Sequence, residues 1–453
     1  MNLENTHKIY FIGIGGIGMS ALARYFKNKG VSVSGYDKTA TSLTKELEAE
    51  GIPVHYEENI SLIPKDAELI VYTPAVPQDH KELNFFKENK YEVVKRSEVL
   101  GEITKHHFTI AIAGTHGKTS ISSMTAHVLK QSGLKITAFI GGISQNFSSN
   151  ILMDDNPDVL IVEADEYDRS FHTLNPDIAI ISSVDADHLD IYGNYENLLE
   201  SFKIFASKIK AGGKLIRKAE IGKEKLSSQN EFTYSVNSEA DYTAINIMQE
   251  DGGFVYGIKN STETIENIHT GTSAFFNIEN SIPAAVVAKH FNISNDKIRN
   301  AISSFRGVKR RFELIAQNAD TIYIDDYAHH PEELKQCILS ARKLFPDKKI
   351  TGVFQPHLYS RTRDLADEFA ESLSQLDEVI ILDIYPAREL PIPGVSPEMI
   401  LEKMNVKNKC SCKKEDLINL LKSSSIEVLL TLGAGDIDQL VEPIKEWIEN
   451  KNK

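Results

Sequence analysis

Short apolar runs recur along the chain, and each is followed by a polar or glycine-rich loop and then by a helical pattern. These runs have the length of buried strands. The clearest ones lie at residues 8–12, 31–35, 69–72, 109–113, 159–162, 178–182, 321–324, 350–354, 379–382 and 428–432. Strands that alternate with helices form parallel α/β sheets, whose ligands bind beyond the carboxyl ends of the strands. Functional side chains are therefore expected in the loops that follow the strands.

The same pattern divides the 453 residues into three α/β domains. We expect a Rossmann-like domain over residues 1–106, a central domain with a mostly parallel sheet over residues 107–312, and a second Rossmann-like domain over residues 313–453. Residues 218–275 are polar and rich in turns. They predict antiparallel strands at the edge of the central sheet.

Glycine residues follow the first strand in the pattern G-x-G-x-x-G, from Gly13 to Gly18. Glycines let the backbone approach a diphosphate, and the helix that begins here offers free N–H groups. Asp37 stands about 20 residues further on, a distance at which an acidic residue can bind a ribose hydroxyl. The motif predicts a diphosphate ligand. By itself it leaves open NAD, FAD, a UDP-sugar or a purely structural tight turn.

A phosphate-binding loop follows the strand at residues 109–113 and opens a helix. It consists of Gly114, Thr115, His116, Gly117, Lys118, Thr119 and Ser120, and it is shorter than the usual G-x-x-x-x-G-K-[ST]. Backbone amides would surround the phosphates, Lys118 would reach the β and γ phosphates, and the Thr119 hydroxyl would meet Mg²⁺. The central domain is therefore expected to be a P-loop-type ATPase domain.

Carboxylates follow two other strands of the central domain. The first group is Glu163, Asp165 and Glu166, and the second is Asp185, Asp187, His188 and Asp190. Carboxylates at the end of a buried strand repel one another unless a cation lies among them. Mg²⁺ and Mn²⁺ prefer oxygen ligands with an occasional imidazole. We predict that Glu163 and His188 bind metal, whereas helix capping is an equal alternative for Asp185 and Asp190.

Two loops of the third domain carry histidine, tyrosine and arginine side chains. Residues 325–331 include His329, and residues 355–362 include His357 and Arg361. Both loops follow strands, so they are expected at one edge of a sheet, where they could bind a small acid and position an amine. The basic cluster at residues 309–311 suits phosphate or carboxylate recognition, or is a solvated run of charge.

Composition narrows the classes of function. Lys and Arg number 50 and Asp and Glu number 64, a net charge of −14, which disfavours broad nucleic-acid binding. Three cysteines make no disulfide framework and indicate a reducing compartment, hence the cytoplasm; Cys410 and Cys412 are expected to be ordinary thiols. No apolar run approaches the ~18 residues of a membrane span, so no membrane partner is expected.

Together the motifs resemble the Mur ligase family, the ATP-dependent enzymes that add amino acids during peptidoglycan synthesis. The shortened loop at residues 114–119 has the family's form. The similarity extends across nearly all of the chain, and it is carried by residues 13–23, 163–166, 325–331, 355–362 and 385–396. The resemblance implies that the first domain binds the UDP moiety of a substrate and not a nicotinamide cofactor.

The resemblance also implies a reaction. An ADP-forming ligase would join L-alanine to the lactoyl carboxylate of UDP-N-acetylmuramate through an acyl phosphate, with ATP and Mg²⁺ as cofactors. The implied metal ligands are Thr119, Glu163 and His188. The implied catalytic residues are Lys118, Glu163, His188, His357 and Arg361, and Asn277 and Asn280 would lie near the nucleotide. The implied UDP-substrate residues are Gly15, Gly16, Ile17, Gly18, Asp37, Thr73, Glu166 and His329.

Three positions depart from the family pattern. Leu358 stands where Arg is common, Tyr167 replaces a usual Ser, and Phe276 replaces a usual His. The run Glu-Ala-Asp-Glu-Tyr-Asp is similar to the ligase that recycles whole murein peptides, which is the alternative activity, although residues 355–362 and 385–396 favour L-alanine. An NAD-dependent oxidoreductase would leave residues 114–119 unexplained. A non-catalytic nucleotide-binding module is a further alternative.

Overall fold

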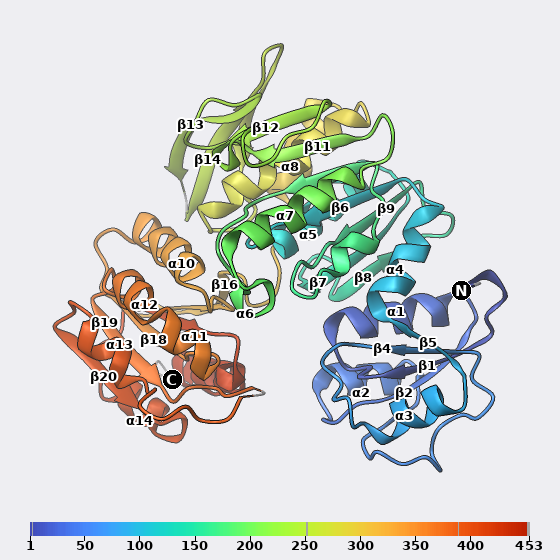
Figure 1. Ribbon diagram of the computed structural model, residues 1–453. Coiled ribbons are helices and arrows are strands. Elements are labelled where there is room, and N and C mark those ends of the chain that lie inside the picture. The colour runs from blue at the N-terminus through green and yellow to red at the C-terminus, as the bar shows by residue number, and fades with distance from the viewer. Residues whose placement is uncertain (2, 251, 388, 451–453) are drawn as a thin grey trace. The chain divides into compact units, whose positions relative to one another are not determined.

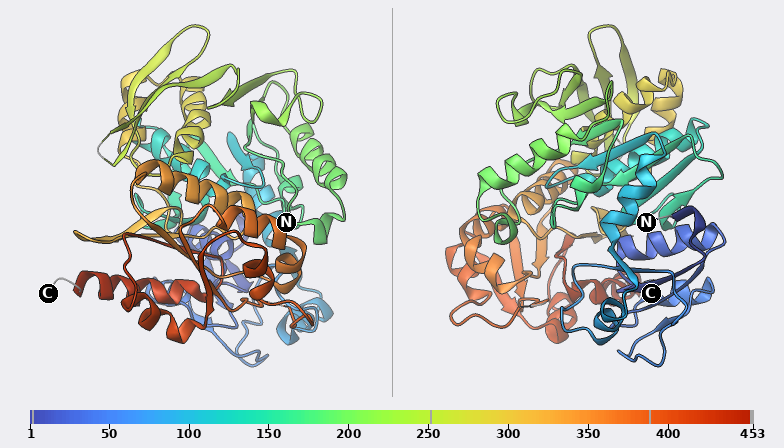
Figure 2. Two further views of the ribbon diagram at one scale, coloured as in Figure 1. Left: turned by 90° about the vertical axis from the view of Figure 1, so that its left-hand side faces the viewer. Right: turned by 45° about the vertical axis from the view of Figure 1, so that its right-hand side comes forward.

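The computed structural model describes residues 1, 3–250, 252–387 and 389–450, without the side chains of Leu189 and Asp190. This part of the chain forms three β-sheets flanked by helices (Figures 1 and 2). The chain divides into two compact units. The first comprises Met1–Asn246, Tyr256–Ile268 and Glu279–Arg306, and the second comprises Ile247–Val255, His269–Ile278 and Gly307–Lys453.

The first sheet is parallel throughout and has the strand order β3-β2-β1-β4-β5. Its strands are β1 (Lys8–Ile12), β2 (Ser32–Tyr36), β3 (Val54–His55), β4 (Leu69–Tyr72) and β5 (Glu92–Lys95), and its helices are α1 (Ile17–Asn28), α2 (Ser42–Ala49), α3 (Lys81–Glu88) and α4 (Arg96–Lys105). The central strand β1 reads Lys-Ile-Tyr-Phe-Ile because both of its faces are covered. The expected Rossmann-like arrangement is confirmed.

The second sheet contains ten strands in the order β15-β14-β13-β12-β11-β10-β6-β9-β7-β8. The strands are β6 (Thr109–Ala113), β7 (Ile136–Ser144), β8 (Ser149–Met153), β9 (Val159–Glu163), β10 (Ile178–Ile181), β11 (Lys214–Lys218), β12 (Glu231–Ser235), β13 (Tyr242–Glu250), β14 (Gly253–Lys259) and β15 (Thr264–His269). The helices are α5 (Lys118–Gln131), α6 (Leu189–Tyr192), α7 (Tyr195–Ser207), α8 (Phe276–His290) and α9 (Asn295–Ser303), and the short helix η2 spans Ser170–Thr173.

One expectation for the second sheet is wrong where β11, β12 and β13 pair. β12 pairs in parallel with β11, and β13 pairs in parallel with β12, although antiparallel strands were predicted for residues 218–275. The contact between β12 and β13 is limited to Tyr234 and Ser235 against Tyr242 and Thr243. Because only the end of β12 pairs with the start of β13, a short loop is enough for β13 to run in the same direction as β12. The alternation of polar and apolar residues does not indicate strand direction.

The third sheet has the order β16-β17-β21-β18-β19-β20 and is parallel except for its edge strand β16. The strands are β16 (Glu313–Gln317), β17 (Ile322–Asp326), β18 (Ile350–Phe354), β19 (Glu378–Leu382), β20 (Asn408–Cys412) and β21 (Val428–Leu432). The helices are α10 (Pro331–Leu344), α11 (Tyr359–Asp364), α12 (Ala366–Leu373), α13 (Glu398–Lys403), α14 (Leu417–Lys422) and α15 (Val441–Asn450).

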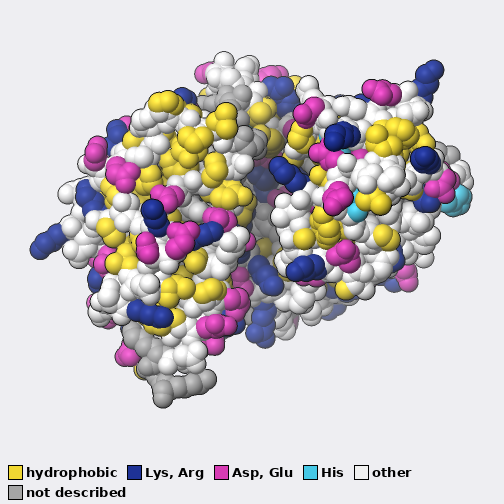
Figure 3. Space-filling model, turned by 90° about the horizontal axis from the view of Figure 1, so that it is seen from below, with side chains coloured by type: hydrophobic (Ala, Val, Ile, Leu, Met, Phe, Trp, Pro, Cys, Tyr) yellow, Lys and Arg dark blue, Asp and Glu magenta, His cyan; other side chains and the backbone are white. Residues whose placement is uncertain are grey.

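The surface carries mixed charge. Figure 3 shows acidic and basic side chains interspersed over one face of the molecule. Such interspersion weakens any long-range field of a single sign. Among the described residues, no helix combines the length and the apolarity that crossing a bilayer requires.

A buried amide fixes the first turn of α1 against the second sheet. Asn150 of β8 is fully buried, and its Nδ2 donates to the carbonyl of Ile17 at 2.5 Å and to Ser20 Oγ at 2.9 Å. Arg24 of the same helix donates from Nη1 to Asn150 Oδ1 at 2.7 Å. α1 also packs on β7 and β8. The glycine-rich loop that precedes α1 is thereby held at a fixed place in the first compact unit.

Replacing Asn150 by Ala should lower the free energy of unfolding by about 1–3 kcal/mol, since buried hydrogen-bonding groups would lose their partner. Urea unfolding followed by circular dichroism measures this loss. Asn408→Ala, at an exposed position on the edge strand β20, is the matched control. Equal unfolding curves for the two variants would contradict the anchoring role.

Candidate active site

The phosphate-binding loop lies between β6 and α5 and is braced by two serines. Ser183 Oγ accepts from the backbone N–H of His116 at 2.8 Å and lies 2.9 Å from Thr115 Oγ1, and Ser182 Oγ donates to the carbonyl of His116. A Cβ atom at Gly114 would stand 2.2 Å from Ser182 Oγ, and Gly117 has a φ of +82°. Only glycine therefore fits both positions.

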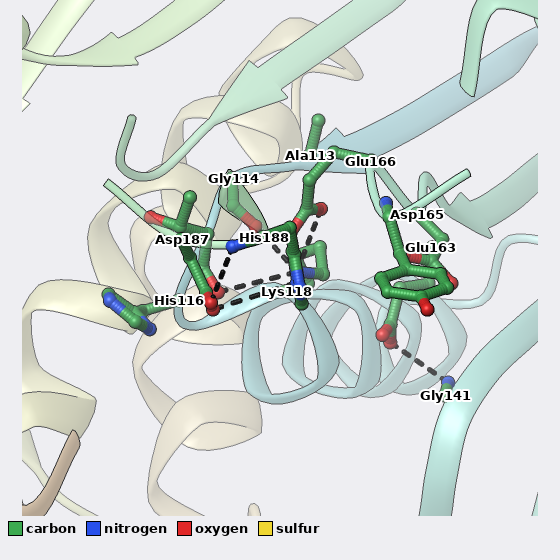
Figure 4. A network of polar contacts seen from close by, with 12 residues as sticks. Ala113, Gly114, His116, Lys118, Gly141, Glu163, Asp165, Glu166, Asp187 and His188 are labelled. Carbon is green, nitrogen blue, oxygen red and sulfur yellow. Dashed lines mark hydrogen bonds and ion pairs between the residues drawn. The ribbon is translucent and has the colours of Figure 1, made fainter. Parts of the chain in front are cut away.

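Lys118 extends from the first position of α5 back over the loop (Figure 4). Its Nζ donates to the carbonyl of Gly114 at 2.6 Å and to Glu166 Oε1 at 2.9 Å. Burial alone would lower the pKa of Lys118. The negative charges of Glu166, Asp165 and Glu163 outweigh burial and raise that pKa above its usual range. The loop thus carries a fixed positive charge at the place where phosphates would lie.

Glu163 ends β9 opposite the hydroxyl of Thr119. Thr119 Oγ1 donates to Glu163 Oε1 at 3.0 Å, and the backbone N–H of Gly141 on β7 donates to Oε2 at 2.9 Å. A Cβ atom at Gly141 would lie 2.2 Å from Glu163 Oε1. The absence of a side chain at Gly141 therefore lets its amide orient the carboxylate toward Thr119.

His188 lies in the loop after β10, in a backbone conformation that few residues adopt. Its φ is +55°, and its N–H donates to Asp187 Oδ1 at 2.7 Å. Its Nε2 is 3.6 Å from Glu166 Oε1, and its ring meets the ring of Tyr167 edge-on at 5.0 Å. Left-handed backbone at a non-glycine residue costs energy and is concentrated at functional sites.

The donor set fits a magnesium ion that arrives with a nucleotide. Thr119 and Glu163 offer two hard oxygens side by side, which matches the one or two protein ligands that Mg²⁺ takes besides phosphates and waters. Among the described residues, no three His, Cys, Asp or Glu side chains are grouped closely enough to hold a metal by themselves. The metal role of Thr119, Glu163 and His188 stays a prediction that these oxygens support.

The remaining acidic and nucleotide candidates are placed as follows. Asp185 Oδ2 is 3.7 Å from His116 Nε2, while the side chain of Asp190 lies outside the described residues. Asn280 is buried, and its Oδ1 would be 3.2 Å from a Cβ at Gly117 of the phosphate loop. Asn277 belongs to the second compact unit and donates to Thr272 Oγ1 at 2.8 Å. Asn280 therefore lies against the phosphate loop.

The glycine-rich loop gathers six of the predicted UDP-substrate residues at the end of β1: Gly15, Gly16, Ile17, Gly18, Asp37 and Thr73. The N–H of Gly15 donates to Asp37 Oδ2 at 2.8 Å, and a Cβ at Gly13 would be 2.8 Å from Thr73 Cγ2. Glu166, also predicted to bind the UDP substrate, pairs with Lys118 at the phosphate loop. His329 lies in the second compact unit.

In the second compact unit, His329 and His357 lie close to each other and to Tyr385. The ring centroids of the two histidines are 5.9 Å apart, and His357 stacks on Tyr385 at 5.8 Å. Glu333 Oε2 is 3.3 Å from His329 Nδ1. Arg361 is half-buried in α11, which follows the His357 loop. The two loops after β17 and β18 do meet at one edge of the sheet, as predicted.

The loop that carries His329 is held by buried carboxylates. Asp326 accepts from the N–H groups of Phe312 and Ala328, both at 2.7 Å, and burial raises the pKa of Asp326 to about 7. Arg310 donates from Nε to Asp325 Oδ2 at 2.9 Å, and both Arg310 and Arg311 contact the ring of Tyr327. The guanidinium of Arg310 is therefore engaged within the fold.

Comparison with known proteins agrees with this geometry. Three family models match in sequence: the Mur ligase family catalytic domain over residues 8–108, the Mur ligase middle domain over residues 112–288, and the Mur ligase glutamate ligase domain over residues 310–435. The chain belongs to the Mur ligase family. The fold expected for the family, with three α/β domains and mostly parallel sheets, is the one observed.

Individual Mur ligases are similar over their full length. The UDP-N-acetylmuramate–L-alanine ligase of Flavobacterium psychrophilum is 49% identical, with 100% of each chain covered. A crystal structure of the UDP-N-acetylmuramate–alanine ligase of Thermotoga maritima has a TM-score of 0.84 and 27% identity, covering 98% of this chain and 99% of that one. A murein peptide ligase from Psychrobacter arcticus shares the fold at 22% identity, with a TM-score of 0.72 and 98% and 99% of the chains covered.

The three departures from the Mur ligase pattern have structural settings. Leu358 is buried, has a φ of +70° and precedes α11, with its N–H donating to the carbonyl of Tyr385. Tyr167 packs on His188, as above. Phe276 meets Phe312 edge-on at 6.2 Å at the start of α8. Each departing side chain therefore packs within the protein.

Several contacts of the site have no pattern in the sequence. Ser182, Ser183 and Gly141 brace the phosphate loop and Glu163, yet none of them stands in a motif. Tyr385 belongs to residues 385–396, which carry the family resemblance, but its contact with His357 was not predicted; its position after the strand β19 is the signal for that contact.

His188→Ala is expected to raise the Mg²⁺ concentration needed for half-maximal phosphate release from ATP. Losing a metal ligand or its supporting partner costs about 10- to 100-fold in metal affinity. The measurement is a Mg²⁺ titration of phosphate release. The control is His106→Ala, because His106 is exposed and lies outside the loop. An unchanged titration would remove His188 from the metal site.

Asp326 should make stability depend on pH. Its folded-state pKa is about 7, against about 3.9 for an unfolded aspartate. The folded state then binds more protons between these values, so the contribution of Asp326 to the free energy of unfolding falls as pH rises from about 4 to about 7. Urea unfolding of wild type and Asp326→Asn across this range tests it. If the difference in the free energy of unfolding between wild type and Asp326→Asn did not vary with pH, the predicted pH dependence would be contradicted.

Proposed function

We propose that this chain joins L-alanine to the lactoyl carboxylate of UDP-N-acetylmuramate and converts ATP to ADP and phosphate. The observation that carries the proposal is similarity over the full length to a ligase of this name, at 49% identity. The structure adds a phosphate-binding loop with a charged lysine and, in the same compact unit, a glycine-rich loop suited to a diphosphate.

The first step is transfer of the γ-phosphoryl group. A carboxylate oxygen of the lactoyl group forms a bond to the γ-phosphorus, the bond to the β-phosphate oxygen breaks, and ADP leaves. Carboxylate and triphosphate are both anionic, so their approach needs positive charge. Lys118 supplies it, and the loop amides hold the phosphates in place. Bound at Thr119, Glu163 and His188, Mg²⁺ would add further charge neutralisation.

The second step is capture of the acyl phosphate by the amino group of L-alanine. The amine nitrogen attacks the carbonyl carbon, a tetrahedral intermediate forms, phosphate leaves and the amine loses a proton. Little covalent help is needed once amine and acyl phosphate are held together, because positioning raises their effective concentration. We assign His329, His357 and Arg361 to the muramoyl and alanine groups, on the strength of their shared sheet edge.

We place the reaction in the cytoplasm, since ATP and a UDP-sugar are its reactants. The second candidate is ligation of a whole murein peptide, which the Tyr167 departure favours. A panel of amino acids beside the murein tripeptide, with phosphate release as the readout, separates the two activities. A preference for L-alanine supports the proposal, whereas a preference for the tripeptide supports the alternative.

Lys118→Ala should reduce phosphate release by about 10²-fold or more, the usual loss when a charge-stabilising donor is removed. Lys203→Ala, an exposed lysine of α7, is the control. Because Lys118→Ala leaves the buried Glu166 without its partner, the double variant Lys118→Met with Glu166→Gln removes both charges together. Near-normal phosphate release by either variant would overturn the assignment.

A further inference from the structure

Arg96 is the first residue of α4, and that helix is held firmly. A Cβ atom at Gly101 would lie 2.7 Å from the carbonyl oxygen of Thr173, so α4 and η2 are in close contact. Thr173 Oγ1 also donates to the carbonyl of Ser97 at 2.8 Å. Ser97, the residue after Arg96, is therefore fixed to η2, so the backbone that carries the Arg96 side chain is held in place.

The guanidinium of Arg96 lies between the first turn of α1 and the loop that follows β9, both in the first compact unit. On one side, Arg96 Nη1 would be 2.2 Å from a Cβ at Gly18, so the guanidinium rests against the first turn of α1. On the other side, Arg96 Nη2 is 3.9 Å from Asp165 Oδ2, just after β9. A side chain at Gly18 would collide with the guanidinium of Arg96. Glycine at this position therefore makes room for Arg96, besides letting the backbone approach a ligand.

The hydrogen-bonding capacity of Arg96 is unused. Within the part of the chain that the structure describes, the 3.9 Å ion pair with Asp165 is its one charged contact, and no protein group accepts a hydrogen bond from its five N–H donors. Arg96 also lines a small hollow together with Glu163, Asp165, Ser170 and Phe171. The N–H donors of Arg96 are therefore available to an acceptor from outside the protein.

Electrostatics indicates what the ligand is. The first turn of α1 has Gly16 as its N-cap, so no side chain covers its N–H groups, and these groups favour an anion. Across the hollow stand Glu163 and Asp165, whose carboxylates repel an anion. A substrate anion that reaches from α1 toward Lys118 needs a cation at this point, and Arg96 is placed there.

We infer that Arg96 binds the sugar-side phosphate of the substrate's diphosphate, in a bidentate manner, and so sets how far the muramoyl group reaches toward the phosphate-binding loop. This rests on the proposed function, because it takes a UDP-sugar as the ligand. The planar fork of arginine matches two phosphate oxygens, which a lysine cannot do. Arg96 is thus a binding residue that also positions the reacting carboxylate.

Calorimetric titration with UDP, UMP and Mg²⁺-ADP tests the inference on the full chain. Arg96→Met should weaken UDP binding by about 10- to 100-fold, the range expected for loss of hydrogen bonds between charged groups. UMP lacks the second phosphate, so its affinity should stay within about twofold, a difference of less than one hydrogen bond. Mg²⁺-ADP affinity should not change, which also shows that the variant is folded. Arg96→Lys should recover only part of the loss.

Two further variants separate binding from a structural role. Lys95→Met removes the neighbouring exposed positive charge and should leave UDP affinity unchanged. Asp165→Asn removes the ion pair but keeps Arg96, and it should bind UDP at least as tightly as the wild type. If Asp165→Asn reproduced the loss seen in Arg96→Met, Arg96 would only tie two loops together and the inference would fail.

The remaining outcomes are also decisive. Equal weakening of UDP and UMP by Arg96→Met would mean general damage to the domain and would overturn the inference. Unchanged UDP affinity with weaker binding of UDP-N-acetylmuramate would assign Arg96 to the lactoyl carboxylate and overturn it as well. Failure of the wild type to bind UDP at all would instead refute the proposed function, so the two failures are distinguishable.

Discussion

A buried lysine ammonium is the constraint on which the central site depends. Lys118 is enclosed by the loop that carries it, and burying such a charge costs several kcal/mol unless an opposite charge lies beside it. Glu166 supplies that charge from the end of β9, a strand adjacent to β6 in the sheet. The same strand end then brings Glu163 to Thr119. Pairing one cation therefore fixes the acidic motif against the phosphate loop.

The glycine-rich loop is tied to this centre by polar groups and not by a large apolar surface alone. Asn150 satisfies the carbonyl of Ile17 and the guanidinium of Arg24, so the first turn of α1 has a defined position on β8. α4 adds a second tie through Thr173. A ligand held at α1 is thus presented to the phosphate loop from a rigid frame, which is what phosphoryl transfer to a substrate carboxylate requires.

The sequence allowed prediction of features formed by residues that are neighbours in the chain, but not of contacts between residues far apart in the chain. The strands at residues 8–12, 69–72, 109–113, 350–354 and 428–432 match the observed ones because burial on both faces leaves a continuous apolar run. The phosphate loop was predictable because its glycines, lysine and threonine are neighbours in the chain. Ser183, Gly141, Asn150 and Arg96 act on partners far away in sequence, and single serines, glycines or asparagines carry no pattern. The predicted direction of β12 and β13 was wrong for the same reason, because strand pairing depends on where the connecting loop brings the chain back to the sheet.

In the second compact unit, the constraint is not a buried lysine but strained backbone at two residues that precede β16. Arg310 and Phe312 have φ values of +59° and +50°, a conformation that costs a bulky residue about 1–3 kcal/mol. Asp325 and Asp326 offset this cost, one by accepting from the Arg310 side chain and the other from the Phe312 amide. Those carboxylates end the strand from which the His329 loop departs. The geometry of the chain entering this sheet and the geometry of its histidine loop are therefore set by the same two aspartates, so neither can relax without disturbing the other.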